Sequence, residues 1–124
     1  MWALFLRLMR DPGGVIMRYQ ILNQNRDFLR MYRRAQNKVH PLLVTYVAKN
    51  RHNQNRVGIT ASKKVGCAVK RNRAKRVIRA AFRNLQKTPQ GYDIVFVARA
   101  RTTQCKMQDV QAVMQQHIDC LTER

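Results

Sequence analysis

The chain has 124 residues, 45% of them hydrophobic, so it is long enough to bury the core of one domain and does not have the composition of a disordered segment. Its 25 Lys and Arg against 6 Asp and Glu give a formal net charge of +19, which favours a polyanionic partner. Three cysteines without CxxC spacing argue against a disulfide framework or a zinc site, and they favour a reducing, cytoplasmic compartment.

The N-terminus is set apart from the rest of the chain. Its apolar run is too short to span a bilayer, and the charges follow that run instead of preceding it, which is the wrong order for a secretory signal. A Pro-Gly-Gly sequence at 12–14 then breaks the chain. We expect residues 1–16 to be a poorly ordered extension, with Met17 as an alternative start, and residues 17–124 to form a single domain.

Beyond this extension, helical and strand patterns alternate. Strands are predicted where β-branched and aromatic residues alternate between two faces, and helices where apolar residues recur at helical spacing. The predicted elements are helix 26–36 capped by Asn25, strand 42–48, strand 56–62, helix 67–86, strand 92–100, and helix 106–122 capped by Thr102 or Thr103. This order of helix, strand, strand, helix, strand, helix predicts an α+β sandwich in which a basic helix packs on a small sheet.

The second of these helices, 67–86, includes most of residues 62–79, SKKVGCAVKRNRAKRVIR, which hold eight Lys or Arg and no acid. At 100° per residue the apolar side chains fall on one stripe: Ala74, Val77, Ile78, Ala81, Phe82 and Leu85. The polar side chains fall on the opposite side: Asn72, Arg73, Lys75, Arg76, Arg79 and Arg83. A helix anchored by one face, with a row of guanidinium groups on the other, is suited to binding phosphates. A merely solvated face would carry Glu beside its basic residues, and none is present.

The pattern favours RNA over DNA, because a helix that reads the major groove usually lies in a helix-turn-helix, whereas strands flank this one. The aromatic residues Phe28, Tyr32 and Tyr46 fit two readings equally: a surface on which unpaired bases stack, or part of the core. No Ser/His/Asp set, paired carboxylates or metal cluster is apparent. The sequence therefore shows no recognisable set of catalytic residues for hydrolysis.

Residues 56–79 resemble the signature of the protein component of bacterial ribonuclease P. The segments R-x-G, K-K and A-V-x-R-N-x-x-K-R-x-x-R occur in the same order and spacing, and the resemblance extends over about 17–122. It implies a fold like the second domain of ribosomal protein S5, with a left-handed β-α-β crossover. It also implies a subunit of ribonuclease P that binds a large catalytic RNA, which removes the 5′ leader of precursor tRNA with Mg²⁺. The protein itself is expected to bind no cofactor or membrane and to need no protein partner.

The resemblance also assigns two groups of residues. Those implied to bind the catalytic RNA are Lys63, Lys64, Arg71, Asn72, Arg73, Lys75, Arg76 and Arg79. Those implied to line a cleft for the single-stranded leader are Phe28, Tyr32, Val44, Tyr46, Thr60 and Lys64. No residue is expected to be catalytic. The alternatives are a ribosomal-type RNA-binding protein without a leader cleft and a DNA-binding regulator.

Overall fold

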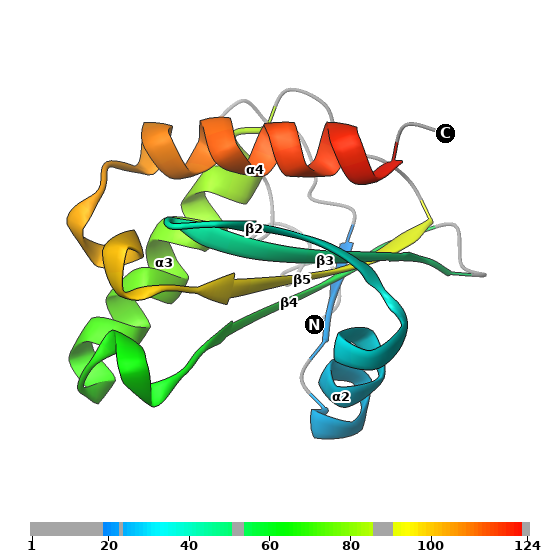
Figure 1. Ribbon diagram of the computed structural model, residues 1–124, viewed down its shortest axis with the longest axis horizontal. Helices are drawn as coiled ribbons and strands as arrows, with labels where there is room; N and C mark the ends of the chain where they lie inside the picture. The colour runs from blue at the N-terminus through cyan, green and yellow to red at the C-terminus, as the bar shows by residue number, and fades with distance from the viewer. Residues whose placement is uncertain (1–18, 23, 51–53, 86–90, 123–124) are drawn as a thin grey trace, which may run out of the picture.

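A computed structural model describes residues 19–22, 24–50, 54–85 and 91–122, so the extension expected at 1–16 lies outside the described residues. The elements are β1 (Tyr19–Ile21), α2 (Asn25–Arg34), β2 (Gln36–His40), β3 (Leu43–Lys49), β4 (Asn55–Ala61), 3₁₀ helix η1 (Lys63–Val65), α3 (Ala68–Arg83), β5 (Tyr92–Ala98), 3₁₀ helix η2 (Ala100–Gln104) and α4 (Met107–Thr122). Within this part of the chain five strands form one sheet in the order β1-β4-β5-β3-β2. Helices α3 and α4 cover one face of the sheet and α2 lies on the other (Figure 1). The predicted α+β architecture is confirmed.

The sheet is mixed. Strands β4 and β5 are parallel neighbours connected through α3, whereas β3 pairs antiparallel with both β5 and β2. Strand β1 adds a short parallel edge beside β4. The helix between β4 and β5 is the basic helix, so the strand pairing fixes where its charges lie relative to the sheet.

Several local predictions are wrong. Strands β1 and β2 are not predicted from the sequence, and the first helix ends at Arg34 instead of running to 36. Gln24, not Asn25, holds the N-cap position of α2, and no side chain caps it. Thr102 and Thr103 lie in η2 and do not cap the last helix, which begins at Met107.

The central strands send alternate side chains to two different cores. On β3, Leu43, Thr45 and Val47 are buried beneath α3 and α4, while Tyr46 packs in a second cluster on the α2 side. The main core consists of Leu43, Val47, Val57, Val65, Ala74, Ile78, Ala81, Phe82, Ile94, Phe96, Ala98, Val110, Val113, Met114 and Ile118. The second cluster is smaller, with Leu22, Met31 and Val95 fully buried. Because it is small, the α2 face keeps part of the sheet open to solvent.

The basic helix is anchored along the predicted stripe. Ala74, Ile78 and Ala81 are 0% exposed, and Val77 and Leu85 pack against the same core. At its N-terminus, Gly66 separates η1 from α3 with a φ of 134°, a conformation that side-chain-bearing residues rarely adopt. The helix therefore leaves the end of β4 in a direction set by the backbone at Gly66.

His117 of α4 makes the fold sensitive to acid. It is 7% exposed and its Nδ1 lies 2.9 Å from Thr45 Oγ1. Burial, and then the nearby His40 and Lys38, lower the pKa of His117 from 6.5 to about 4. The folded protein therefore keeps this ring neutral while the unfolded chain takes up a proton below pH 6.5, so the free energy of unfolding falls as the pH drops from 6.5 towards 4. A shift of this size corresponds to a loss of about 3 kcal/mol.

The measurement is urea denaturation at pH 7 and pH 4.5 of the wild type and of His117→Gln, whose amide can still meet Thr45 but does not titrate. We expect the wild type to lose more stability between the two pH values than the variant does. An equal loss in both proteins would assign the acid sensitivity to other groups.

Candidate nucleic-acid interface

The basic face of α3 is exposed as its periodicity predicts. Asn72, Arg73, Arg76 and Arg79 are exposed, and Lys75 is half-buried at the edge of the row. Their backbone is held by the buried stripe on the other side of the same helix. The arginines therefore project from a fixed support, which suits recognition of phosphates at fixed positions.

The other predicted residues of this group differ in their surroundings. Lys63 and Lys64 are exposed on η1, directly before the helix. Arg71 is half-buried, and its Nε is enclosed without a hydrogen-bond partner among the described residues. A buried donor without an acceptor is costly, so Arg71 is the member of the group that gains most from an acceptor supplied by a ligand.

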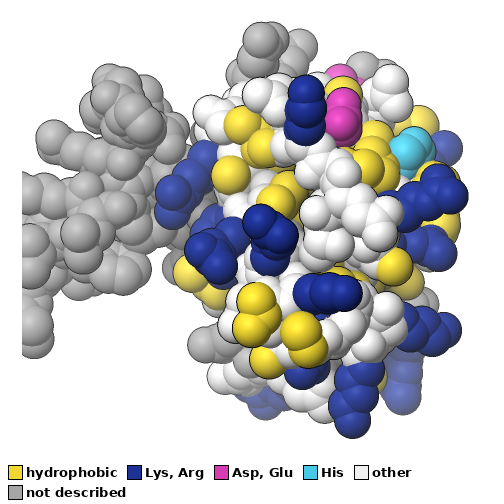
Figure 2. Space-filling view, turned by 90° about the vertical axis from the view of Figure 1, so that its left-hand side faces the viewer, with side chains coloured by type: hydrophobic (Ala, Val, Ile, Leu, Met, Phe, Trp, Pro, Cys, Tyr) yellow, Lys and Arg dark blue, Asp and Glu magenta, His cyan; other side chains and the backbone are white. Residues whose placement is uncertain are grey.

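Positive charge covers this side of the molecule. Figure 2 shows Lys and Arg side chains at many places on this face, whereas acidic side chains are visible only as one small group near the top. One acid within the sheet is already engaged: Asp93 forms a two-pronged ion pair with Arg56, with contacts of 2.8 Å from Nε and 2.7 Å from Nη2. The arginine of the R-x-G segment is thus a structural residue that ties β4 to β5.

Three predicted cleft residues from three different elements meet on the α2 side of the sheet. The rings of Tyr32 and Tyr46 have centroids 5.0 Å apart at an angle of 61°, an edge-to-face pair. Burial and then Tyr46 raise the pKa of Tyr32 above its usual 10.0, while the neighbouring Thr60 side chain lowers it by less, so the phenol is neutral at physiological pH. Tyr32 is nevertheless 40% exposed. The pair therefore offers an aromatic surface that solvent can reach.

Phe28 has a mainly structural position. A Cβ placed on Gly58 would lie 2.7 Å from Cε1 of Phe28, so the phenyl ring rests directly on the backbone of β4. This close approach requires glycine at 58. Phe28 is half-buried in the second cluster and fixes α2 on the sheet. The aromatic residues were expected either to stack on bases or to belong to the core. Phe28 mainly serves core packing, whereas the exposed part of Tyr32 has no packing role.

The remaining cleft residues, Val44 and Lys64, lie together at a cavity of about 600 Å³ beyond the tyrosine pair. We call it the valine cavity; its lining residues are Val39, His40, Pro41, Val44, Ser62, Lys64, Val97, Ala98, Arg99, Ala100 and Arg101. The sequence does not indicate Arg99 or Arg101 as site residues, because the strand predicted over 92–100 includes Arg99. That strand ends at Ala98, and both arginines are exposed just after it. The sequence does contain one signal for them. Arg alternates with Ala over residues 98–101, and because a buried strand does not accommodate these charges, the pattern indicates that the strand ends before Arg99.

Cys67 lies at the start of α3, and its thiol is a chemical probe of the interface. It is exposed, and the backbone N–H groups of Lys70 and Val69 lower the pKa of the thiol. Because the thiolate is the reactive form, we expect iodoacetamide at pH 7 to alkylate Cys67 faster than Cys120, which is exposed on α4. Peptide mass spectrometry over a time course measures both rates. Equal rates would show that the start of α3 does not activate the thiol.

No helix in the described part of the chain is long and apolar enough to cross a membrane. No group of three or more His, Cys, Asp and Glu side chains among the described residues could hold a metal ion. The exposed arginine row and the aromatic surface beside the valine cavity together define a nucleic-acid-binding protein of the α+β class.

Comparison with known proteins identifies the family. The family model described as Ribonuclease P matches residues 16–122. The ribonuclease P protein component of Clostridium botulinum (strain Loch Maree / Type A3) is 42% identical over 100 residues, which cover 79% of this chain and 90% of that protein. The corresponding protein of Clostridium kluyveri is 46% identical over 81 residues, covering 63% of this chain and 72% of that one. The chain belongs to the ribonuclease P protein family.

Solved structures agree with this assignment. The Staphylococcus aureus RNase P protein matches with a TM-score of 0.71 and 28% identity, over 82% of this chain and 94% of that chain. The RNase P protein from Thermotoga maritima matches with a TM-score of 0.69 and 26% identity, over 85% and 97% of the two chains. Membership makes the chain a subunit of an endoribonuclease that acts in tRNA 5′ maturation, with a ribonuclease P RNA as its partner.

Proposed function

We propose that α3 binds the ribonuclease P RNA and that the cleft on the α2 side holds the single-stranded 5′ leader of precursor tRNA. The observation that carries the proposal is the separation of the two surfaces by the sheet. Arg73, Arg76 and Arg79 project from a helix on one face, whereas the Tyr32–Tyr46 pair, of which Tyr32 is exposed and Tyr46 half-buried, lies on the other. Two distinct RNA segments can therefore be bound at the same time.

The surface for the RNA subunit comprises Lys63, Lys64, Arg71, Asn72, Arg73, Lys75, Arg76 and Arg79. Arginine forks bind phosphate oxygens in pairs, so a rigid row of them recognises the spacing of an RNA backbone without reading base edges. Such binding releases counterions. The logarithm of the affinity should therefore fall with the logarithm of salt concentration, with a slope of about −0.7 to −0.9 for each phosphate contacted.

The cleft for the leader comprises Phe28, Tyr32, Val44, Tyr46, Thr60 and Lys64. The exposed tyrosine surface supports stacking of an unpaired base, which is tolerant of sequence because every base has an aromatic face. Lys64 lies on the rim of the valine cavity and belongs to both surfaces. It would place positive charge between the leader and the RNA subunit.

The protein contributes binding and position in this proposal, and the RNA carries the bond cleavage. Asp27 and Asp93 are each paired with an arginine, and the described residues do not fit a magnesium site. We therefore place the Mg²⁺ ions with the RNA subunit. The protein lowers the repulsion between two RNA molecules and holds the leader. Its three cysteines are free, which suits the reducing cytoplasm where we expect it to act.

The test is rescue of cleavage at low Mg²⁺ concentration. Ribonuclease P RNA is incubated with precursor tRNA, with and without the protein, and the mature 5′ end is quantified. We expect the protein to restore cleavage, and to increase the affinity for a substrate with a leader more than for one without. Binding to the RNA without any rescue would favour a ribosomal-type RNA-binding protein instead.

A further inference from the structure

A second cavity lies at the end of the sheet opposite the valine cavity. Figure 1 shows the last turn of α4 above this end, where β2 begins and β3 ends, while the β2–β3 turn lies at the other end. The cavity has a volume of about 370 Å³, and we call it the α4-end cavity; its lining includes Arg34, Val47, Lys49, Tyr92 and Leu121. None of the described residues that line it belongs to the proposed leader cleft or to α3. A volume of this size is typical of a site for one small ligand.

Apolar side chains from the sheet and from α4 meet in this cavity. Val47 on β3 and Ile94 on β5 are paired neighbours in the main core, and two residues away along the same strands Lys49 pairs with Tyr92. Side chains two residues apart share a face, so Lys49 and Tyr92 stand next to each other on the α4 side of the sheet. Leu121, in the last turn of α4, packs against the same core. Tyr92 and Leu121 are only half-buried, so both present apolar surface to the cavity.

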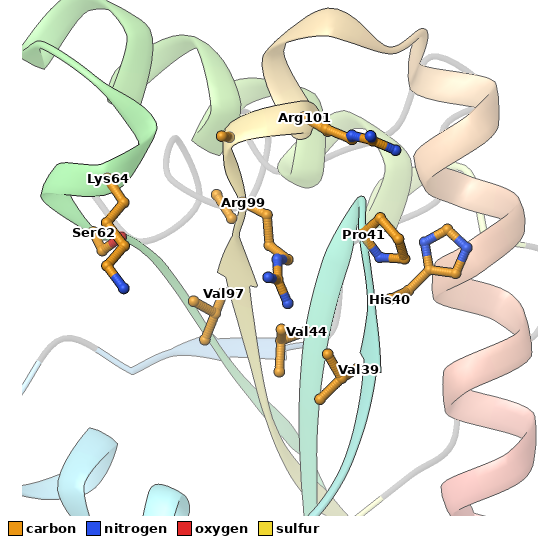
Figure 3. Close-up of a pocket in the computed structure, with 11 residues that line it drawn as sticks. Val39, His40, Pro41, Val44, Ser62, Lys64, Val97, Arg99 and Arg101 are labelled. Carbon is orange, nitrogen blue, oxygen red and sulfur yellow. The ribbon is translucent and has the colours of Figure 1, made fainter.

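The charged side chains at the α4-end cavity are cationic. Arg34 comes from the last turn of α2 and Lys49 from the end of β3, and both are exposed. Neither forms an ion pair within the described part of the chain, and none of the described residues that line the cavity is acidic. The carboxyl end of α4 contributes a partial negative charge at the opposite wall. An anionic group is therefore favoured beside Arg34 and Lys49 and disfavoured beneath α4. Figure 3 shows the contrasting valine cavity, where the cations are Lys64, Arg99 and Arg101.

The end of β3 also directs backbone groups towards the α4-end cavity. Among the described strands, β2 pairs with β3 only as far as Val47, so no strand lies beside Lys49 on that side. The N–H of Asn50 donates to the carbonyl of Gly91 at 2.8 Å, which is on the β5 side. Because successive residues of an antiparallel strand direct their backbone groups to opposite neighbours, those of Lys49 point away from β5. One donor and one acceptor therefore face the side on which the cavity lies.

We propose that the α4-end cavity binds one nucleotide, with its base against Tyr92 and Leu121 and its phosphate at Arg34 and Lys49. The base edge meets the backbone of Lys49, and the guanidinium and ammonium groups bind the phosphate oxygens. Inorganic phosphate would use only the cations and an apolar ligand only the other walls, so a ligand with both parts gains most. A free nucleotide and an unpaired nucleotide of an RNA strand supply the same chemistry. The site is separate from both surfaces of the proposed function and does not depend on them.

The test is photo-crosslinking of the full chain in complex with ribonuclease P RNA, so that the basic face of α3 is already occupied. The probe is an azido derivative of adenosine monophosphate (AMP), and peptide mass spectrometry with fragmentation locates the labelled residues. We expect saturable labelling at Tyr92 that unmodified AMP prevents and that inorganic phosphate at the same concentration does not. Labelling at Tyr32 or Tyr46 reports separately on the leader cleft, so the outcome at Tyr92 is independent of the proposed function.

Lys49→Ala and Arg34→Gln should each raise the probe concentration needed for half-maximal labelling at Tyr92 about tenfold, with the affinity for ribonuclease P RNA near that of the wild type. Lys106→Ala is the matched control, because it removes one exposed positive charge just before α4, outside the cavity, and it should label as the wild type.

A single-stranded oligoadenylate distinguishes the two sources of the ligand. Competition no stronger than that of AMP identifies a free nucleotide, and stronger competition identifies a nucleotide of an RNA strand; both results support the site. Phosphate that competes as well as AMP would show a general anion site and overturn the proposal. Labelling at Tyr92 that is absent, or that both cavity variants leave unchanged, would overturn it as well.

Discussion

Replacing Arg73 and Arg76 together by alanine is expected to weaken binding of the ribonuclease P RNA by about two to three orders of magnitude. Both side chains are exposed on α3, and each loses a charge-assisted contact worth about 2 kcal/mol. The fold should be unaffected, because the buried stripe of α3 is untouched. Equilibrium filter binding across a salt series measures both the affinity and the number of phosphates lost from the interface.

Two controls make this result specific. Arg73→Lys with Arg76→Lys keeps both charges but loses the paired geometry, so we expect an intermediate affinity. Arg33→Ala with Arg34→Ala removes the same number of exposed charges from the last turn of α2. If this second pair weakened RNA binding as much as the first, net charge alone would account for the interaction and α3 would have no special role.

Tyr46→Ala is expected to weaken binding of precursor tRNA with a leader by about tenfold, with little effect on assembly with the RNA subunit. The change removes one of the two rings of the aromatic surface and the edge-to-face partner that holds Tyr32, and stacking of one base is worth about 1–3 kcal/mol. The measurement is the dissociation constant of the holoenzyme for substrates with and without a leader.

Since Tyr46 also packs in the second cluster, two further variants separate stacking from stability. Tyr46→Leu keeps apolar bulk without an aromatic face and should behave as the alanine variant. Tyr46→Phe keeps the face and should bind as the wild type. If the Arg73 and Arg76 variant and the Tyr46 variants lost the same function to the same degree, the two-surface proposal would be wrong.

The elements that the sequence predicts well are those whose burial follows a simple period. The apolar stripe of α3 recurs at helical spacing, and every member of it packs against the main core. On β4, Val57, Ile59 and Ala61 face that core, as their alternation predicts. The secondary structure of these segments can be predicted from their own sequence, because one side of each is buried and the other is not, which gives a periodic pattern of apolar residues.

The two missed strands carry no such signal. Strand β2, QNKVH, has exposed side chains at four of its five positions and residues of low strand propensity, so only pairing with β3 makes it a strand. Strand β1 has three residues and exists as an edge beside β4. The caps fail for a related reason: Thr102 can cap a helix locally, but its hydroxyl is used by the carbonyl of Leu42, 60 residues away.

The candidate site also has one part that local periodicity predicts and one part that it does not. The arginine row could be placed from the helical period alone, whereas the leader cleft came from the family resemblance and not from any local pattern. The meeting of Tyr32, Tyr46 and Thr60 depends on how α2 crosses two strands, and the position of Arg99 depends on where β5 ends. Residues that converge from separate elements are not predictable from the periodicity of any one of them.

The backbone turn at Gly66 has a consequence for the geometry of the assembled particle. The cleft ends at Ser62 and Lys64, and the arginine row begins a few residues later, so Gly66 is the joint between them. Its φ of 134° sets the angle at which α3 leaves β4. In the proposed function, that angle would set the direction of the leader in the cleft relative to the RNA bound on α3. Gly66 would thus set the relative orientation of the two proposed RNA-binding surfaces through its backbone alone, without contacting either RNA.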